Sequence, residues 1–94
     1  MNVNLDELNV LHFPEKSRFE ICVDNLVAEL TYILDDKTII FLHTGVPSEL
    51  EGQGVGRKLV IAGLEYAHTN NLRIRSVCWF VTGYLQRHPE YQTS

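Results

Sequence analysis

The chain has 94 residues, of which 45% are hydrophobic and 21% charged, and this composition is typical of one folded domain rather than a disordered or repetitive polypeptide. Eight Lys and Arg residues against 12 Asp and Glu residues give a formal charge of −4, whereas a nucleic-acid binder needs a basic surface, so nucleic acid is a poor candidate partner. No apolar run reaches the roughly 18 residues of a membrane span, and the N-terminus lacks the pattern of a secretory signal. We therefore expect a single cytoplasmic domain over residues 1–94, without membrane contact.

The first half of the chain shows the period-two alternation of half-buried β-strands. It predicts strands at 18–23, 26–34 and 38–46, and a further short strand around 9–13. Within 26–34, the period-two pattern places Leu26, Ala28, Leu30, Tyr32 and Leu34 on one apolar face. Residues 38–46 are apolar at odd- and even-numbered positions alike, so both faces of this strand are apolar, which predicts a strand buried on both sides. The connections between these strands are short and polar, so neighbouring strands should be antiparallel, because a parallel return needs a crossover of about a dozen residues or more.

The second half of the chain predicts, in order, a helix at 55–69, a strand at 73–80 that includes Cys78, and a short helix at 81–88. The long helix is indicated by Val60, Leu64 and Ala67, which recur at helical spacing. A strand, a helix and a strand in succession form a right-handed crossover, so the two strands that flank the helix should be parallel. The expected fold class is α/β (α+β), a mostly antiparallel sheet with one parallel β-α-β step and a ligand crevice at its carboxyl end.

The two cysteines, Cys22 and Cys78, match no zinc-binding spacing and no Cys-x-x-Cys redox pair. We expect both to be free thiols and expect no metal site.

Three alternating glycines, Gly52, Gly54 and Gly56, stand between a predicted strand and the long predicted helix. Without Cβ atoms, the main-chain N–H groups of such a loop can converge on an anion at the positive end of the helix. The Walker A pattern is absent because no Gly-Lys-Ser/Thr follows, and Arg57 stands where a dinucleotide fingerprint has its third glycine. The loop is a candidate phosphate site, with a tight turn that merely starts the helix as the alternative.

Several short stretches together resemble the small members of the GCN5-related N-acetyltransferases. They are Arg18-Phe19-Glu20, the strand that ends at Tyr32, His43-Thr44 with Val46-Pro47, residues 51–56 with Leu59-Val60, and Cys78 with His88-Pro89-Glu90-Tyr91. The resemblance covers residues 18–91 and implies a truncated form of the acyl-CoA N-acyltransferase fold. It also implies acetyl-CoA as the cofactor. The family's loop begins with Gln or Arg, whereas this chain has Glu51, whose charge is unsuited to a pyrophosphate.

The cofactor-binding residues that follow from this resemblance lie at a strand end and in the glycine loop: Thr44, Gly45, Val46, Gly52, Gln53, Gly54, Val55, Gly56 and Arg57. Main-chain N–H groups of the loop would bind the pyrophosphate, and Arg57 would approach the phosphates. If the two parallel strands diverge, N–H groups at 44–46 would hold the pantetheine arm and polarise the thioester carbonyl.

Acetyl transfer to an amine needs a base, and it gains from an acid that protonates the departing thiolate. His43 is the candidate base, because imidazole titrates closest to neutral pH; a purely structural histidine is the alternative. The resemblance implies a catalytic Cys78, either as a nucleophile that carries the acetyl group or as a weak acid, and a buried inert thiol is the alternative. It further implies Tyr84 as a general acid on the short helix.

The function predicted from the sequence is transfer of an acetyl group from acetyl-CoA to an amine acceptor, either a small molecule or a protein. The net negative charge favours a cationic acceptor. The alternative is a non-catalytic module with the same fold that binds acyl-CoA or a protein partner. The sequence specifies neither the acceptor nor the oligomeric state.

Overall fold

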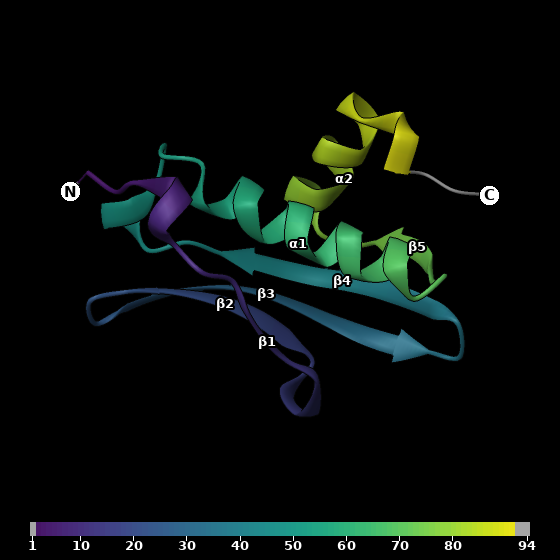
Figure 1. Cartoon of the computed structure of the whole chain (residues 1–94). Helices are drawn as coiled ribbons and strands as arrows, with labels where there is room; N and C mark the ends of the chain where they lie inside the picture. Colours follow the sequence, from purple (N-terminus) through teal and green to yellow (C-terminus); the bar gives the residue numbers. More distant parts are fainter. Residues whose placement is uncertain (1, 92–94) are drawn as a thin grey trace.

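The protein is built on a five-stranded sheet with both α-helices on one face (Figure 1). The structure is a computed structural model and describes residues 2–91. Its strands are β1 (Leu11–Phe13), β2 (Arg18–Val23), β3 (Leu26–Asp35), β4 (Thr38–Gly45) and β5 (Arg73–Ser76). Its helices are α1 (Val55–Thr69) and α2 (Trp79–Arg87), and short 3-10 turns lie at Leu5–Glu7, Pro14–Lys16, Ser48–Leu50 and Pro89–Tyr91.

The strands lie in the sheet in the order in which they occur in the chain. Neighbouring strands from β1 to β4 are antiparallel, whereas β4 and β5 are parallel and are joined through α1. The predicted fold class, with one parallel step in a mostly antiparallel sheet, is therefore confirmed. The short strand expected around 9–13 is present as β1.

The hydrophobic core lies between the sheet and α1. The sheet contributes the alternating side chains Phe19, Ile21, Ala28, Leu30, Tyr32, Ile39 and Phe41, and the helix contributes Leu59, Val60, Leu64 and Ala67, all of them buried. Gly63 allows the helix to approach this closely, because a Cβ atom there would lie 2.8 Å from Cε1 of Phe41. The helical spacing of Val60, Leu64 and Ala67 in the sequence therefore marks the packed face of α1.

Two predictions about side-chain burial are wrong. The alternation in β3 placed Leu34 on the inner face, but this residue lies close to the end of the hairpin and is 46% exposed. β4 was expected to be buried on both sides, yet Ile40, between the buried residues Ile39 and Phe41, is only partly buried. The reason is that neither α-helix covers the second face of the sheet (Figure 1), which we call the open face.

A β-bulge at Leu42 decides which face each later residue of β4 occupies. Thr31 pairs with His43, whereas Tyr32 pairs with Phe41, so Leu42 is an extra residue in β4. Because side chains alternate along a strand, one extra residue reverses the faces of those that follow. Beyond the bulge, Thr44 takes the helix-covered face, and His43 lies on the open face.

An aromatic cluster closes the core between β1 and the C-terminal half of α1. The His12 ring stacks on Phe19 with centroids 4.1 Å apart and meets the edge of Tyr66 at 4.5 Å. Its Nε2 lies 2.7 Å from the hydroxyl of Tyr32. Burial lowers the pKa of His12, although the Glu15 carboxylate acts in the opposite direction. Burial also raises the pKa of the Tyr32 hydroxyl.

The lowered pKa of His12 makes the stability of the protein depend on pH. Below about pH 6.5, the ordinary imidazole value, the unfolded chain binds a proton at this position more readily than the folded protein does, so acid favours unfolding. The free energy of unfolding in urea should therefore fall between pH 7 and pH 5, and it should fall less in His12→Gln, which keeps a polar group opposite Tyr32. His68→Gln, at an exposed position on α1, should retain the wild-type dependence. Equal slopes for His12→Gln and the wild type would contradict this assignment.

Candidate active site

A cleft of about 880 Å³ opens between the end of β4, the glycine loop and α2. It is lined by residues 44–46, Leu50, residues 51–57, Trp79, Phe80, Tyr84 and Arg87. Its volume is within the range of small-molecule sites in proteins, roughly 300–1,000 Å³. All the residues that the sequence nominated for cofactor binding line this one cleft, at the carboxyl end of the parallel strand pair.

The two parallel strands diverge at the cleft. Their register ends with Phe41 opposite Ser76, followed by one hydrogen bond in which the Val77 N–H donates to the Phe41 carbonyl at 3.0 Å. Beyond this point, residues 42–45 of β4 have no strand neighbour on that side within the described part of the chain. Residues 44 and 45 line the cleft, so the main-chain edge of β4 is accessible there.

The Ser76 side chain ends β5 and turns the chain into α2. The Cys78 N–H donates to Ser76 Oγ at 3.2 Å, and this oxygen also lies 2.9 Å from the Cys78 carbonyl and 3.0 Å from Thr82 Oγ1. These local bonds replace strand pairing. The predicted strand over 73–80 is therefore too long, and α2 begins at Trp79 rather than at residue 81.

Cys78 is consequently not a strand residue but the residue that caps the N-terminus of α2. Cys78 is 6% exposed, and its thiol lies 3.4 Å from Oγ1 of Thr44. Cys78 does not itself line the cleft, although Thr44 does. Both Cys78 and the exposed Cys22 are free.

The glycine loop presents main-chain donors to the cleft. Gly52 and Gly54 have φ angles of +78° and +86°, which residues with a Cβ atom rarely adopt. Within residues 2–91, the N–H groups of residues 54–57 have no protein acceptor, and the first helical bond runs from the Lys58 N–H to the Gly54 carbonyl at 3.0 Å. Four donors without a protein acceptor, at the start of a 15-residue helix, fit a pyrophosphate.

The charged side chains around these donors are mixed in sign. Arg57 and Arg87 both line the cleft, as does the exposed Glu51. The two guanidinium groups suit phosphate oxygens, and Glu51 is the residue at which the loop departs from the family pattern. The sequence predicts a cofactor-binding role for Arg57 but not for Arg87.

One face of α2 forms a wall of the cleft. Phe80, Tyr84 and Arg87 are spaced as i, i+4 and i+7 and all line it, so helical spacing was the signal that would have identified Arg87. A Cβ atom on Gly56 would lie 3.2 Å from the Phe80 ring. The absence of a side chain at Gly56 therefore allows α1 and α2 to approach closely at this point. Tyr84 lies on α2 as predicted, is 5% exposed and stacks on His88 at 4.2 Å.

The N-terminal segment braces the glycine loop from outside. The Val3 N–H donates to Oε1 of Gln53 at 2.9 Å, and the Lys58 ammonium donates to the Leu5 carbonyl. The Leu5 side chain lies over Gly54, where a Cβ atom would come within 2.9 Å of its Cδ1. No periodic pattern in residues 1–17 had indicated these contacts.

His43 lies beside the cleft but not in its wall. Its side chain is exposed on the open face, and a Cβ atom on Gly45, which does line the cleft, would lie 3.2 Å from its Nε2. The Cys78 thiol contacts Thr44, on the helix-covered face of β4. His43 and Cys78 are thus on opposite faces of β4, so the imidazole is not placed to deprotonate this thiol.

Residues 2–91 contain no group of three or more His, Cys, Asp or Glu side chains that could hold a metal ion. No helix described in that range combines the length and the apolar character needed to cross a membrane.

Comparison with known proteins identifies the family. A family described as GCN5-related N-acetyl-transferase matches residues 18–94. Protein NATD1 of Xenopus tropicalis is 26% identical over 86 residues, covering 87% of this chain and 78% of the relative, and Protein NATD1 of Mus musculus is 28% identical over 87 residues, covering 87% and 77%. The NMR solution structure of a GCN5-like protein from Staphylococcus aureus has 40% sequence identity and a TM-score of 0.71, covering 89% of this chain and 83% of that one. The chain belongs to the GCN5-related N-acetyltransferase family.

Proposed function

We propose that the protein transfers an acetyl group from acetyl-CoA to an amine acceptor. The observation that carries this proposal is the set of unbonded N–H groups at residues 54–57, placed at one end of a cleft that also exposes the main-chain edge of β4. Membership of the acetyltransferase family supports it.

The cleft offers complementary groups for each part of the coenzyme. The N–H groups of the glycine loop would hold the pyrophosphate, and Arg57 and Arg87, which line the same cleft, would neutralise it. The main-chain edge at residues 44–46, where β4 ends, would hold the pantetheine amides in the manner of an added strand. Trp79 and Phe80 supply apolar wall on the α2 side.

When bound, acetyl-CoA would supply a thioester: the amine nitrogen would bond to its carbonyl carbon as the carbon–sulfur bond broke, and the coenzyme would leave as a thiolate. His43 takes up the proton that the amine nitrogen loses, from the open-face side of Gly45. Tyr84, in the cleft wall, donates its hydroxyl proton to the thiolate and regains one from water. Main-chain N–H groups of β4 polarise the carbonyl.

Cys78 fits a supporting role better than that of an acyl carrier. Cys78 stands at the N-terminus of α2, a position that favours a thiolate, but an acyl carrier must also reach the thioester. Cys78 does not line the cleft, and His43 lies on the other face of β4. The Cys78 thiol instead contacts the Thr44 hydroxyl at 3.4 Å and is almost fully buried. Direct transfer from the coenzyme to the amine is therefore the proposed route.

Two measurements test this function. Calorimetric titration with acetyl-CoA should give saturable binding, and a panel of amines assayed for released thiol should identify an acceptor that accelerates release. No saturable heat at millimolar ligand would refute the proposal. Binding without turnover on any amine would leave the non-catalytic acyl-CoA-binding module as the better description.

Intact-mass spectrometry after incubation with acetyl-CoA tests the route. We expect no lasting acetyl adduct, and we expect Cys78→Ala to keep turnover within about tenfold of the wild type, because the thiol does not reach the cleft. An adduct of one acetyl group that disappears in Cys78→Ala, together with loss of turnover, would establish the acyl-cysteine route instead.

A further inference from the structure

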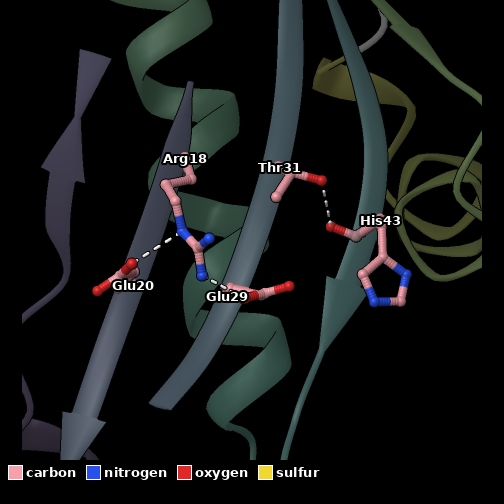
Figure 2. A network of polar contacts seen from close by, with 5 residues as sticks. All are labelled: Arg18, Glu20, Glu29, Thr31 and His43. Carbon is pink, nitrogen blue, oxygen red and sulfur yellow. Dashed lines mark hydrogen bonds and ion pairs between the residues drawn. The ribbon is translucent and has the colours of Figure 1, made fainter. Parts of the chain in front are cut away.

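The open face of the sheet carries a row of polar side chains, shown in Figure 2, that the proposed chemistry has not used apart from His43. Arg18 on β2 donates to Oε1 of Glu29 on β3, and its Nε lies 2.8 Å from Oε2 of Glu20. All three side chains are partly shielded from solvent. Arg18 therefore holds two carboxylates in fixed positions across neighbouring strands.

Glu29 and His43 both lie close to Gly45, although no direct ion pair joins these two residues in the part of the chain that the structure describes. Glu29 is the register partner of Gly45 across the β3–β4 pair, and the bulge at Leu42 puts His43 on the same face. A Cβ atom on Gly45 would lie 3.2 Å from Nε2 of His43 and 3.7 Å from Oε2 of Glu29. Both side chains thus lie close to Gly45, which has no side chain to separate them. A bridging water or a change of side-chain rotamer would link them.

The two oxygens of Glu29 face different partners. Oε1 accepts from Arg18, and Oε2 is the atom directed toward Gly45 and His43. In Figure 2 the Glu29 carboxylate lies between the Arg18 guanidinium and the His43 ring. Its contact with Arg18 restricts the orientation of the carboxylate.

We infer that Glu29 is a positioning residue that orients His43 and stabilises its imidazolium form, and that Arg18 fixes Glu29 for this task. This inference rests on the proposed function. The proton released by the attacking amine moves to His43 Nε2 and later passes to water, and Glu29 remains a carboxylate throughout. The carboxylate stabilises the charged imidazolium relative to the neutral ring and so makes His43 the stronger base.

Other charges near His43 have to be separated from this effect. On the same face, Arg18 and Glu20 lie on β2, beyond Glu29. Arg75 on β5 is the register partner of Ile40. Ile40 precedes His43 by three residues along β4. Glu20→Gln removes a carboxylate of the same Arg18 network without touching the position over Gly45, so it is the matched control.

The test compares the wild type with Glu29→Gln and Glu20→Gln in the intact protein. In Glu29→Gln, the NMR titration midpoint of His43 should move to lower pH by about half a unit or more, because a neighbouring negative charge has been removed without a change of shape. The acidic limb of kcat/KM should move in the same direction, and plateau turnover should fall about three- to tenfold. Glu20→Gln should change neither the midpoint nor the limb.

An unmoved His43 midpoint in Glu29→Gln would overturn the inference, as would an equal movement in Glu20→Gln. The NMR readout does not depend on turnover. A shifted midpoint in a protein that acetylates no amine would therefore refute the proposed function and leave the pairing of Glu29 with His43 intact. Turnover with an unmoved midpoint would refute the pairing and leave the proposed function intact.

Discussion

Replacing His43 by alanine should lower turnover by about 10² or more and leave the dissociation constant of acetyl-CoA within a few-fold of the wild-type value. In the proposed mechanism His43 takes the proton of the amine, so its loss should slow the chemical step. The side chain lies on the open face and is not part of the cleft wall, so its removal leaves the coenzyme site unchanged. Steady-state thiol release and calorimetric titration measure the two quantities separately.

His68→Ala is the control for the loss of an exposed histidine, because His68 lies on α1 and does not line the coenzyme cleft. It should retain wild-type turnover. Unchanged turnover in His43→Ala would end the assignment of His43 as the base. A large loss of acetyl-CoA affinity in that variant would mean that His43 supports the binding site rather than the proton transfer.

Replacing Gly54 by valine should weaken acetyl-CoA binding about tenfold or more. Gly54 has a φ of +86°, and a Cβ atom there would lie 2.9 Å from Leu5 Cδ1. A β-branched residue is strained in the left-handed region by roughly 1–2 kcal/mol, so the loop must change its backbone to relieve it. That change misdirects the N–H groups at the start of α1, on which pyrophosphate binding depends.

Calorimetric titration of Gly54→Val should be done at a temperature at which circular dichroism shows it to be folded. Gly83→Ala on α2 is the matched control, because a Cβ atom there makes only an ordinary contact of 3.5 Å with Arg87 and its φ is not positive. This control should bind acetyl-CoA as the wild type does. Wild-type affinity in folded Gly54→Val would show that the loop geometry does not determine binding.

The regular elements and the location of the cleft could be predicted because they depend on periodicity. Alternation identified β2 and β3, and the spacing of Val60, Leu64 and Ala67 identified α1. The order strand, helix, strand then implied the parallel pair and the crevice at its carboxyl end. The candidate coenzyme-binding residues follow from that connectivity and from the glycines.

The face of His43 could not be predicted, since it depends on the bulge at Leu42. The residues before the bulge, Ile39 to Leu42, are all apolar, so no alternation marks where the register changes. The pairing of Glu29 with Gly45 follows from the same register and was equally hidden.

The placement of Cys78 failed for a different reason. The alternating pattern of residues 73–80 continues past the point at which β5 ends, because the Ser76 hydroxyl bonds to the main chain of Cys78 and turns it. Such a local side-chain bond competes with strand pairing but leaves the hydrophobic alternation in the sequence unchanged, so the pattern does not show where the strand ends. Contacts of Val3 and Leu5 with the glycine loop likewise join positions distant in sequence.

The bulge in β4 also bears on the order in which the two substrates can bind. It separates the coenzyme cleft, on the helix-covered side, from the imidazole on the opposite side of the same strand. Under the proposed function, donor and acceptor would therefore approach the strand from opposite directions. Neither substrate would have to bind before the other, and coenzyme A could leave while the acetylated amine is still bound.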